Sequence, residues 1–138
     1  MRGDCFYDTC ILVYALAQRD HREDVARALL AAGGLISVQV LNEFASVAKR
    51  KFRLSFDEIA ALSSASIDLC GVPLPLTLQT HDAAMKIARR YGFQFYDCVI
   101  VASALEAGCR TLYTEDLQHY QEIDTLLIVN PFLSAQNI

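Results

Sequence analysis

The sequence predicts an α/β fold, with a short, mainly parallel central sheet covered by helices on both faces. Short apolar runs alternate with longer segments of helical periodicity, as expected when a crossover helix follows each strand. With 54% hydrophobic and 20% charged residues, the composition suits strands that are buried on both faces. The 138 residues are enough for one hydrophobic core and show no linker, so we expect a single domain over residues 1–138.

The first strand is predicted at residues 6–7, which are aromatic and end at Asp8, and a helix is expected to follow through the apolar residues 11–14. A second helix is predicted over residues 21–32, where apolar side chains recur at helical spacing before two glycines stop it. Asp8 therefore stands at the junction of the first strand and the first helix.

A second strand-helix unit begins with a brief strand at residues 35–36. Ser37 is a good N-cap, and the apolar side chains within residues 40–48 form a helical stripe that leads to a basic cluster.

The next helix is expected to start after Ser55 and to run to Leu69, because Ser55 and Glu58 give a capping-box pattern. Residues 74–78 then supply a third short strand or, because one proline precedes them and another lies within them, an extended connection. The alternation continues with predicted elements at residues 80–91 (helix), 97–107 (helix), 111–113 (strand) and 126–129 (strand).

The formal net charge of −4 argues against a protein that coats nucleic acid by bulk positive charge. It does not exclude a nuclease, because a bound metal ion offsets clustered carboxylates. No stretch approaches the roughly 20 apolar residues that span a bilayer, and no clear signal-peptide pattern is present, so we expect a cytoplasmic protein. The five cysteines form no C-x-x-C pair and are expected to be reduced core residues.

Four acidic residues are predicted to meet at one edge of the sheet. In open parallel sheets the functional crevice lies beyond the carboxyl ends of the strands. Asp8 and Asp116 follow predicted strands, Glu43 lies in the second turn of the helix after another, and Asp97 begins a helix whose N-terminus could face the same crevice. Two carboxylates about 4 Å apart repel by roughly 4 kcal/mol at an effective dielectric of 20, so such a cluster must protonate or recruit a cation. Oxygen ligands favour Mg²⁺ or Mn²⁺.

Each acid also has an ordinary explanation. Asp8 and Asp97 could cap the helices that follow them, and Asp116 could be a turn residue. Glu43 lies at the border of a buried stripe, where an unpaired carboxylate is costly. Its partner is either Arg50, two turns along the same helix, or a bound cation.

Clustered Asp and Glu without His or Cys ligands are typical of sites where hydrated Mg²⁺ activates water for attack on phosphorus. Phosphodiester hydrolysis is therefore the favoured reaction. A basic segment could hold the nucleic-acid backbone, or be a solvated helix end; it consists of Lys49, Arg50, Lys51 and Arg53.

Four segments carry a family resemblance in this order: residues 6–14 (FYDTCILVY), 40–44 (VLNEF), 96–104 (YDCVIVASA) and 112–117 (LYTEDL). Together they resemble the PIN-domain family and, within it, the VapC-type toxins of toxin-antitoxin pairs. The resemblance implies a Mg²⁺- or Mn²⁺-dependent endoribonuclease with RNA as its substrate. It also implies the α/β/α sandwich, a homodimer, and a VapB-like antitoxin whose C-terminal segment covers the active-site groove.

The resemblance carries the family's metal-binding and catalytic acids onto Asp8, Glu43, Asp97 and Asp116. It places supporting residues at Thr9, Thr114 and Glu115. Cys10 departs from the family pattern, because family members usually carry a small polar residue there, commonly asparagine.

Two other functions compete with a nuclease. A PIN-like fold kept only for binding, without catalysis, would still have this sequence pattern, although the presence of all four acids argues against it. A phospho-receiver domain would need an acidic pair near the end of the first strand and a lysine after the last strand. Asp4 is too early for that pair, and Asn130 stands where the lysine would be.

Overall fold

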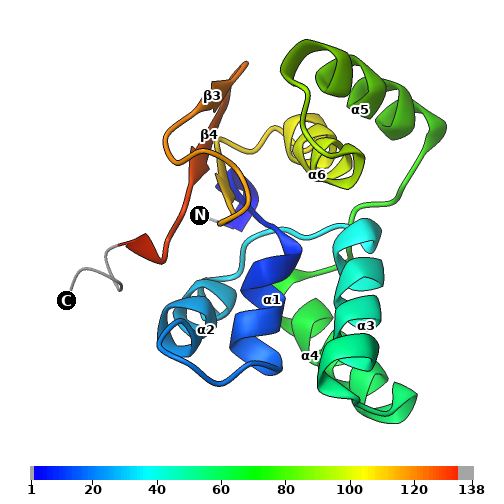
Figure 1. The fold of residues 1–138 in the computed structure, drawn as a ribbon, viewed down its shortest axis with the longest axis vertical. Helices are drawn as coiled ribbons and strands as arrows, with labels where there is room; N and C mark the ends of the chain where they lie inside the picture. Colours follow the sequence, from blue (N-terminus) through cyan, green and yellow to red (C-terminus); the bar gives the residue numbers. More distant parts are fainter. Residues whose placement is uncertain (1, 134–138) are drawn as a thin grey trace.

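The computed structural model describes residues 2–133 and is built on a four-stranded sheet (Figure 1). Its strands are β1 (Cys5–Tyr7), β2 (Thr111–Tyr113), β3 (Glu122–Ile123) and β4 (Leu126–Val129). The strand order is β1-β2-β4-β3, in which β1, β2 and β4 run parallel and β3 pairs antiparallel with β4. The mainly parallel sheet is as predicted, whereas β3 was not predicted.

The chain also runs beside the free edge of β1. The Tyr7 N–H donates to the Leu35 carbonyl and the Leu35 N–H donates to the Cys5 carbonyl, both at 2.9 Å. Ser37 forms a second isolated bridge, with Leu74. The predicted strand at residues 35–36 is thus a single bridge. A strand or an extended connection was expected at residues 74–78. Residues 74–77 form an extended connection with one bridge, because the prolines around Leu74 have no N–H to donate, and Leu78 already begins α5.

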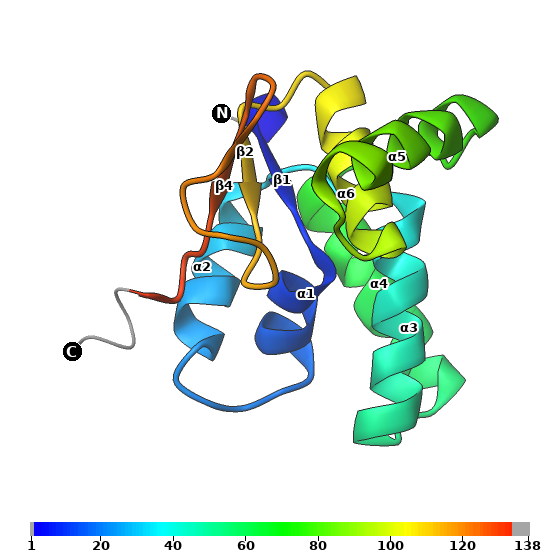
Figure 2. The ribbon, with the colours of Figure 1, turned by 45° about the horizontal axis from the view of Figure 1, so that its top comes forward.

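Helices cover the sheet from two sides (Figures 1 and 2). In the described part of the chain they are α1 (Thr9–Leu16), α2 (Glu23–Ala32), α3 (Val38–Phe52), α4 (Phe56–Cys70), α5 (Leu78–Tyr91) and α6 (Phe95–Glu106), with a short 3-10 helix (Arg2–Asp4) before β1. Helices α5 and α6 pack together on one side, and α1 to α4 form the other group. The predicted α/β/α arrangement is confirmed.

Local signals in the sequence explain most helix ends. The Ser37 hydroxyl accepts a hydrogen bond from the Val40 N–H at 3.3 Å, and the capping box of Ser55 and Glu58 forms with both of its hydrogen bonds. Helix α5 ends at Gly92, whose φ of +74° is readily adopted only by glycine. Three starts differ from the prediction. Helices α5 and α6 each begin two residues earlier, α5 after a Thr77 cap, and α2 begins two residues later.

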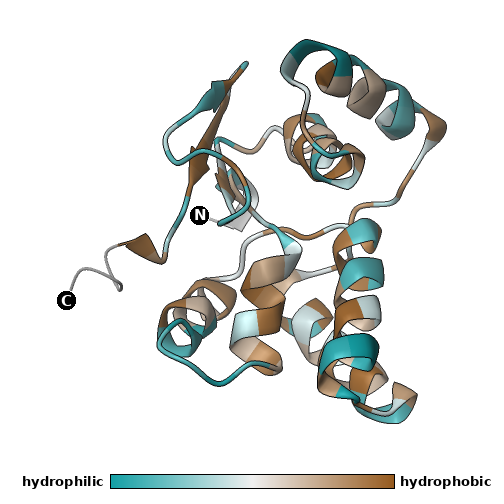
Figure 3. Ribbon diagram, in the orientation of Figure 1, coloured by the Kyte–Doolittle hydropathy of each residue, from teal (hydrophilic) through white to brown (hydrophobic). Residues whose placement is uncertain are grey.

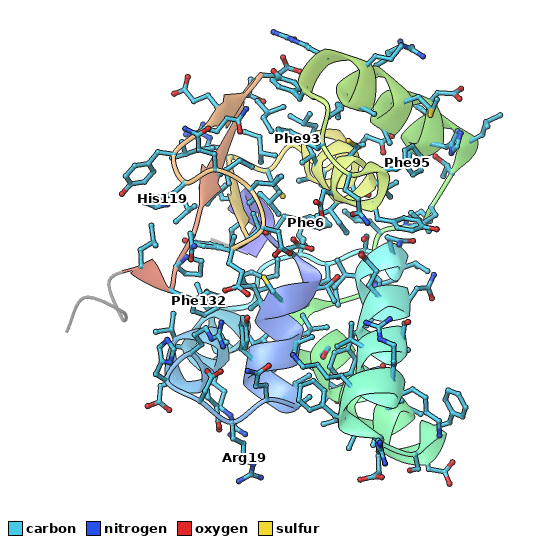
Figure 4. The ribbon with its side chains drawn as sticks, viewed as in Figure 1. Phe6, Arg19, Phe93, Phe95, His119 and Phe132 are labelled. Carbon is cyan, nitrogen blue, oxygen red and sulfur yellow. The ribbon has the colours of Figure 1, made fainter. Side chains whose placement is uncertain are left out.

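The core lies where the sheet meets α1 and α6. In α6 a continuous run of side chains, residues 98–104, is buried, and in α1 most of the helix is buried. Phe6 of β1 is fully buried (Figure 4). The colours of α3 and α5 instead alternate between hydrophilic and hydrophobic, as in helices with one solvent face (Figure 3). No helix in the described chain combines the length and hydrophobicity needed to cross a bilayer.

Candidate metal centre

Asp8 lies at the end of β1 and is the N-cap of α1, with a side chain only 5% exposed. One carboxylate oxygen accepts the Thr9 N–H and the other accepts the Thr114 hydroxyl, both at 2.7 Å. Burial raises the pKa of Asp8 to about 7, even though these two hydrogen bonds lower it, and the charges of Asp116 and Asp97 raise it further. Asp8 therefore caps helix α1, which is the ordinary explanation considered from the sequence. Its carboxylate nevertheless lies in a buried environment that disfavours the charged form.

Glu43 projects from α3 toward the same place. Its carboxylate accepts a hydrogen bond from the Thr9 hydroxyl at 3.3 Å and another from the side chain of Gln39. Its pKa is raised, first by burial and then by the charges of Asp97 and Asp116.

Arg50 is not the partner of Glu43. Its side chain is exposed, and no ion pair joins the two residues in the described structure.

Asp97 lies in the first turn of α6. The N-cap of this helix is Gln94, so the explanation of Asp97 as a helix cap is wrong. Burial and the charge of Asp116 raise the pKa of Asp97 to about 6. The Asp97 carboxylate thus lies near another acid and does not cap its own helix.

Asp116 lies in the loop after β2 and is the most exposed of the four acids. Its backbone N–H donates to the Thr114 hydroxyl oxygen at 3.1 Å, while the same hydroxyl donates to Asp8. Thr114, which is fully buried, thus ties the loop of Asp116 to the end of β1. Partial desolvation and the neighbouring Glu115 raise the pKa of Asp116.

The four acids influence one another and lack counter-ions. Asp116 raises the pKa of each of the other three, and none of the four is in an ion pair within residues 2–133. Ligand atoms of Asp8, Cys10 and Asp116 lie within 4.8 Å of one another. A shared divalent cation relieves this accumulation of negative charge.

Glu115 has different partners. Its carboxylate accepts a short hydrogen bond from the Tyr14 hydroxyl and pairs with Arg22 at 3.4 Å. The guanidinium of Arg22 also donates to the Tyr14 hydroxyl at 2.7 Å, lies over the Tyr14 ring and pairs with Asp20 at 2.6 Å. Phe132 packs edge-on against Tyr14 (Figure 4). These contacts hold the Glu115 side chain toward α1 and the α1–α2 loop. Glu115 thereby supports the loop after β2, which carries Asp116.

Sequence reasoning missed Tyr14 and Arg22 as the partners of Glu115. Glu115 is 101 positions from Tyr14 and 93 from Arg22, and the three residues match no spacing motif, so no sequence signal could have joined them.

A groove of about 210 Å³ adjoins the acids; it is lined by Thr9, Cys10, Val13, Tyr14, Gln18, Glu43, Val47, Lys51 and Asp116. Lys51 is the one member of the predicted basic segment in this lining. Lys49 instead lies over the ring of Phe56, 4.6 Å from its centre. Arg50 and Arg53 are exposed.

Cys10 lies in the first turn of α1, next to the acids. Burial, more than any neighbouring charge, raises the pKa of its thiol well above the usual value, and the backbone N–H of Glu115 opposes this by lowering it. Within the described structure the five cysteines are reduced thiols that form no disulfide, and three of them are buried. Cys10 is thus a half-buried thiol in the site itself.

Comparisons with known proteins identify the family of the chain and structures with a similar fold. A family model described as the PIN domain matches residues 5–125. No curated protein matches the chain by sequence. Among solved structures, VapC20 of Mycobacterium tuberculosis, a sarcin-ricin loop cleaving toxin, is similar with a TM-score of 0.66 and 21% identity, over 82% of this chain and 90% of that chain.

Two further structures are similar over most of their length. VapBC2 of Rickettsia felis, bound to a DNA fragment from its promoter, gives a TM-score of 0.64 and 19% identity, over 90% of this chain and 96% of that chain. FitAcB of Neisseria gonorrhoeae gives a TM-score of 0.63 and 16% identity, over 94% of this chain and 99% of that chain. At these identities the likeness concerns the fold.

Proposed function

Because the chain belongs to the PIN-domain family, we propose that it is a metal-dependent endoribonuclease that hydrolyses phosphodiester bonds of RNA. The observation that carries this proposal is a group of four acids from four separate segments, in which the charge of Asp116 raises the pKa of the other three and ligand atoms of Asp8 and Asp116 lie within 4.8 Å of each other. None of the four is in an ion pair within residues 2–133. A cluster of unpaired carboxylates with no functional role would lower the stability of the fold and have no compensating benefit. Buried acids with raised pKa values are typical of functional sites.

Under this proposal Asp8, Glu43, Asp97 and Asp116 hold Mg²⁺ or Mn²⁺. The donor set fits such an ion, because carboxylate oxygens are the ligands that Mg²⁺ and Mn²⁺ prefer. When bound, the ion supplies an activated water near phosphorus and stabilises the leaving oxygen.

The other residues orient the acids. Thr114 and the Thr9 N–H fix the two oxygens of Asp8, and the Thr9 hydroxyl directs the carboxylate of Glu43. Metal ligands are commonly oriented by such outer hydrogen bonds. Thr9 and Thr114 are therefore assigned as positioning residues, and Glu115 as the anchor of the Asp116 loop.

RNA is the proposed substrate, and Lys51 is its proposed phosphate contact. Lys51 lines the groove that contains Glu43 and Asp116, so a phosphate near the acids comes within reach of its ammonium group. Lys49, Arg50 and Arg53 lie outside the groove lining and are proposed only as more distant contacts.

We also propose that the protein acts in the cytoplasm as a VapC-type toxin, with a VapB-like antitoxin as its partner. The similarity to VapC20 and VapBC2 supports this role through the shared fold. A homodimer belongs to the same proposal. Exposed apolar side chains in and beside the α4–α5 connection, with Val72 at 87% and Leu78 at 76% exposure, are candidates for its interface.

The test is incubation of the purified protein with fragments of tRNA, rRNA and mRNA in the presence of Mg²⁺ or Mn²⁺. We expect cleavage that stops in excess chelator and is lost in Asp97→Asn, with folding unchanged by circular dichroism. Asp82→Asn, an exposed acid on α5, is the matched control. Divalent-ion binding by calorimetry without cleavage of any RNA would favour a PIN-like binding module without catalysis.

A further inference from the structure

Cys10 places a sulfur atom among the carboxylates of the metal centre. Its ligand atom and those of Asp8 and Asp116 all lie within 4.8 Å of one another. Cys10 also lines the groove beside Glu43 and Asp116, so its side chain borders the space from which an ion enters.

The other thiol near the acids is turned away from them. Cys98 directly follows Asp97, yet it is fully buried and its sulfur lies 3.7 Å from the Phe93 carbonyl, to which the thiol donates. Neighbourhood in sequence is therefore not enough to bring a sulfur into the site. Cys98 is a matched control for Cys10.

The spacing of the ligand atoms suits a bound ion. An ion that binds sulfur at about 2.3 Å and a carboxylate oxygen at about 2.1 Å keeps those two atoms within about 4.4 Å of each other. Atoms within 4.8 Å reach this limit through a small side-chain movement. Asp116 can make it, because it is exposed and lies in a loop.

A sulfur donor changes which ions the site prefers. Thiolate is a soft ligand that favours Zn²⁺ and chemically similar ions, whereas Mg²⁺ takes oxygen ligands almost exclusively. We propose that Cys10 is a direct ligand for thiophilic divalent ions, so that Zn²⁺ or Co²⁺ binds through Asp8, Cys10 and Asp116 and displaces Mg²⁺. On binding, the S–H bond breaks, a sulfur-metal bond forms and the proton passes to solvent, without any change of oxidation state. The inference rests on the metal centre of the proposed function.

The test is a titration of the metal-free protein with Co²⁺, followed by absorption spectroscopy. Coordination by sulfur gives a near-ultraviolet charge-transfer band that oxygen ligands do not give. We expect this band in the wild type and in Cys98→Ser, and its loss in Cys10→Asn. We also expect Zn²⁺ to bind Cys10→Asn at least about tenfold more weakly, while Mn²⁺ affinity, measured by electron paramagnetic resonance, changes less.

Each outcome decides between the two proposals. If the wild type binds Mn²⁺ but gives no band with Co²⁺, or if Cys10→Asn keeps the band, the sulfur ligand is excluded and the metal centre stands. If the wild type binds neither ion, the metal centre itself fails. Circular dichroism verifies that the variants fold, and Cys10→Ala replaces Cys10→Asn if the amide does not fit.

Discussion

Replacement of Asp8 by asparagine should stabilise the metal-free protein while it weakens metal binding. The Asp8 carboxylate is buried, and its pKa is raised from 3.8 to about 7, mainly by burial. A carboxyl group with a raised pKa contributes its full stability below its unfolded pKa, near 4, and loses it as the pH rises through 7. The metal-free wild type should therefore become less stable between pH 4 and pH 8.

The size of the effect follows from that shift. About three pKa units correspond to about 4 kcal/mol of lost stability at pH 8. Asparagine keeps an acceptor for the Thr9 N–H but changes the hydrogen bond with Thr114, which costs about 1 kcal/mol. We expect Asp8→Asn to be more stable than the wild type by about 2–3 kcal/mol at pH 8.

The assay is urea unfolding in chelator, followed by circular dichroism at several pH values from 5 to 8. The two proteins should differ much less at pH 5, where Asp8 of the wild type is mostly protonated in the folded state. Addition of Mn²⁺ should stabilise the wild type more than the variant. Asp82→Asn should show neither effect. A variant that is destabilised equally at pH 5 and pH 8 would refute the account of a strained carboxylate.

Three further predictions concern residues around the acids. Thr114→Val should lower the free energy of unfolding by about 1–3 kcal/mol and weaken Mn²⁺ binding, because two hydrogen bonds are lost. The test is urea unfolding and metal titration against Thr111→Val, from the strand that precedes Thr114. Lys51→Ala should weaken binding of RNA fragments, measured by fluorescence anisotropy, more than Lys49→Ala, and equal losses would contradict a groove-specific contact. Glu115→Gln should lower the melting temperature but keep the stoichiometry of Mn²⁺ binding, and loss of that stoichiometry would make Glu115 a ligand.

The sequence predicted those parts of the fold that have strong local signals. The apolar strands at residues 111–113 and 126–129 and the capped helices were predicted because burial pattern and cap chemistry are local. Strand β3 was missed because it has only two residues, one of them the exposed Glu122. The strand predicted at residues 35–36 shrank to one bridge, because its outer neighbour at Leu74 lies between prolines.

The candidate site was predictable only in part, and for a different reason. An acid after a strand and an acid on the border of an apolar stripe are visible in sequence. The hydrogen-bond or ion-pair partner of each acid is not visible in the sequence. Thr114 bonds Asp8 across 106 positions, and Arg22 pairs with Glu115 across 93 positions. Such contacts depend on which strands become neighbours, which the local pattern does not determine.

The same long-range assembly gives a metal ion a structural consequence. The four acids come from the end of β1, from α3, from α6 and from the loop after β2. Repulsion among them acts to separate these elements when no cation is bound, and a cation shared by them joins elements that otherwise meet mainly through the core. Because an ion that binds only the folded state stabilises it by mass action, the elements most sensitive to metal should be those that carry the acids. Helices α2 and α4, which contribute none of the four, should respond least.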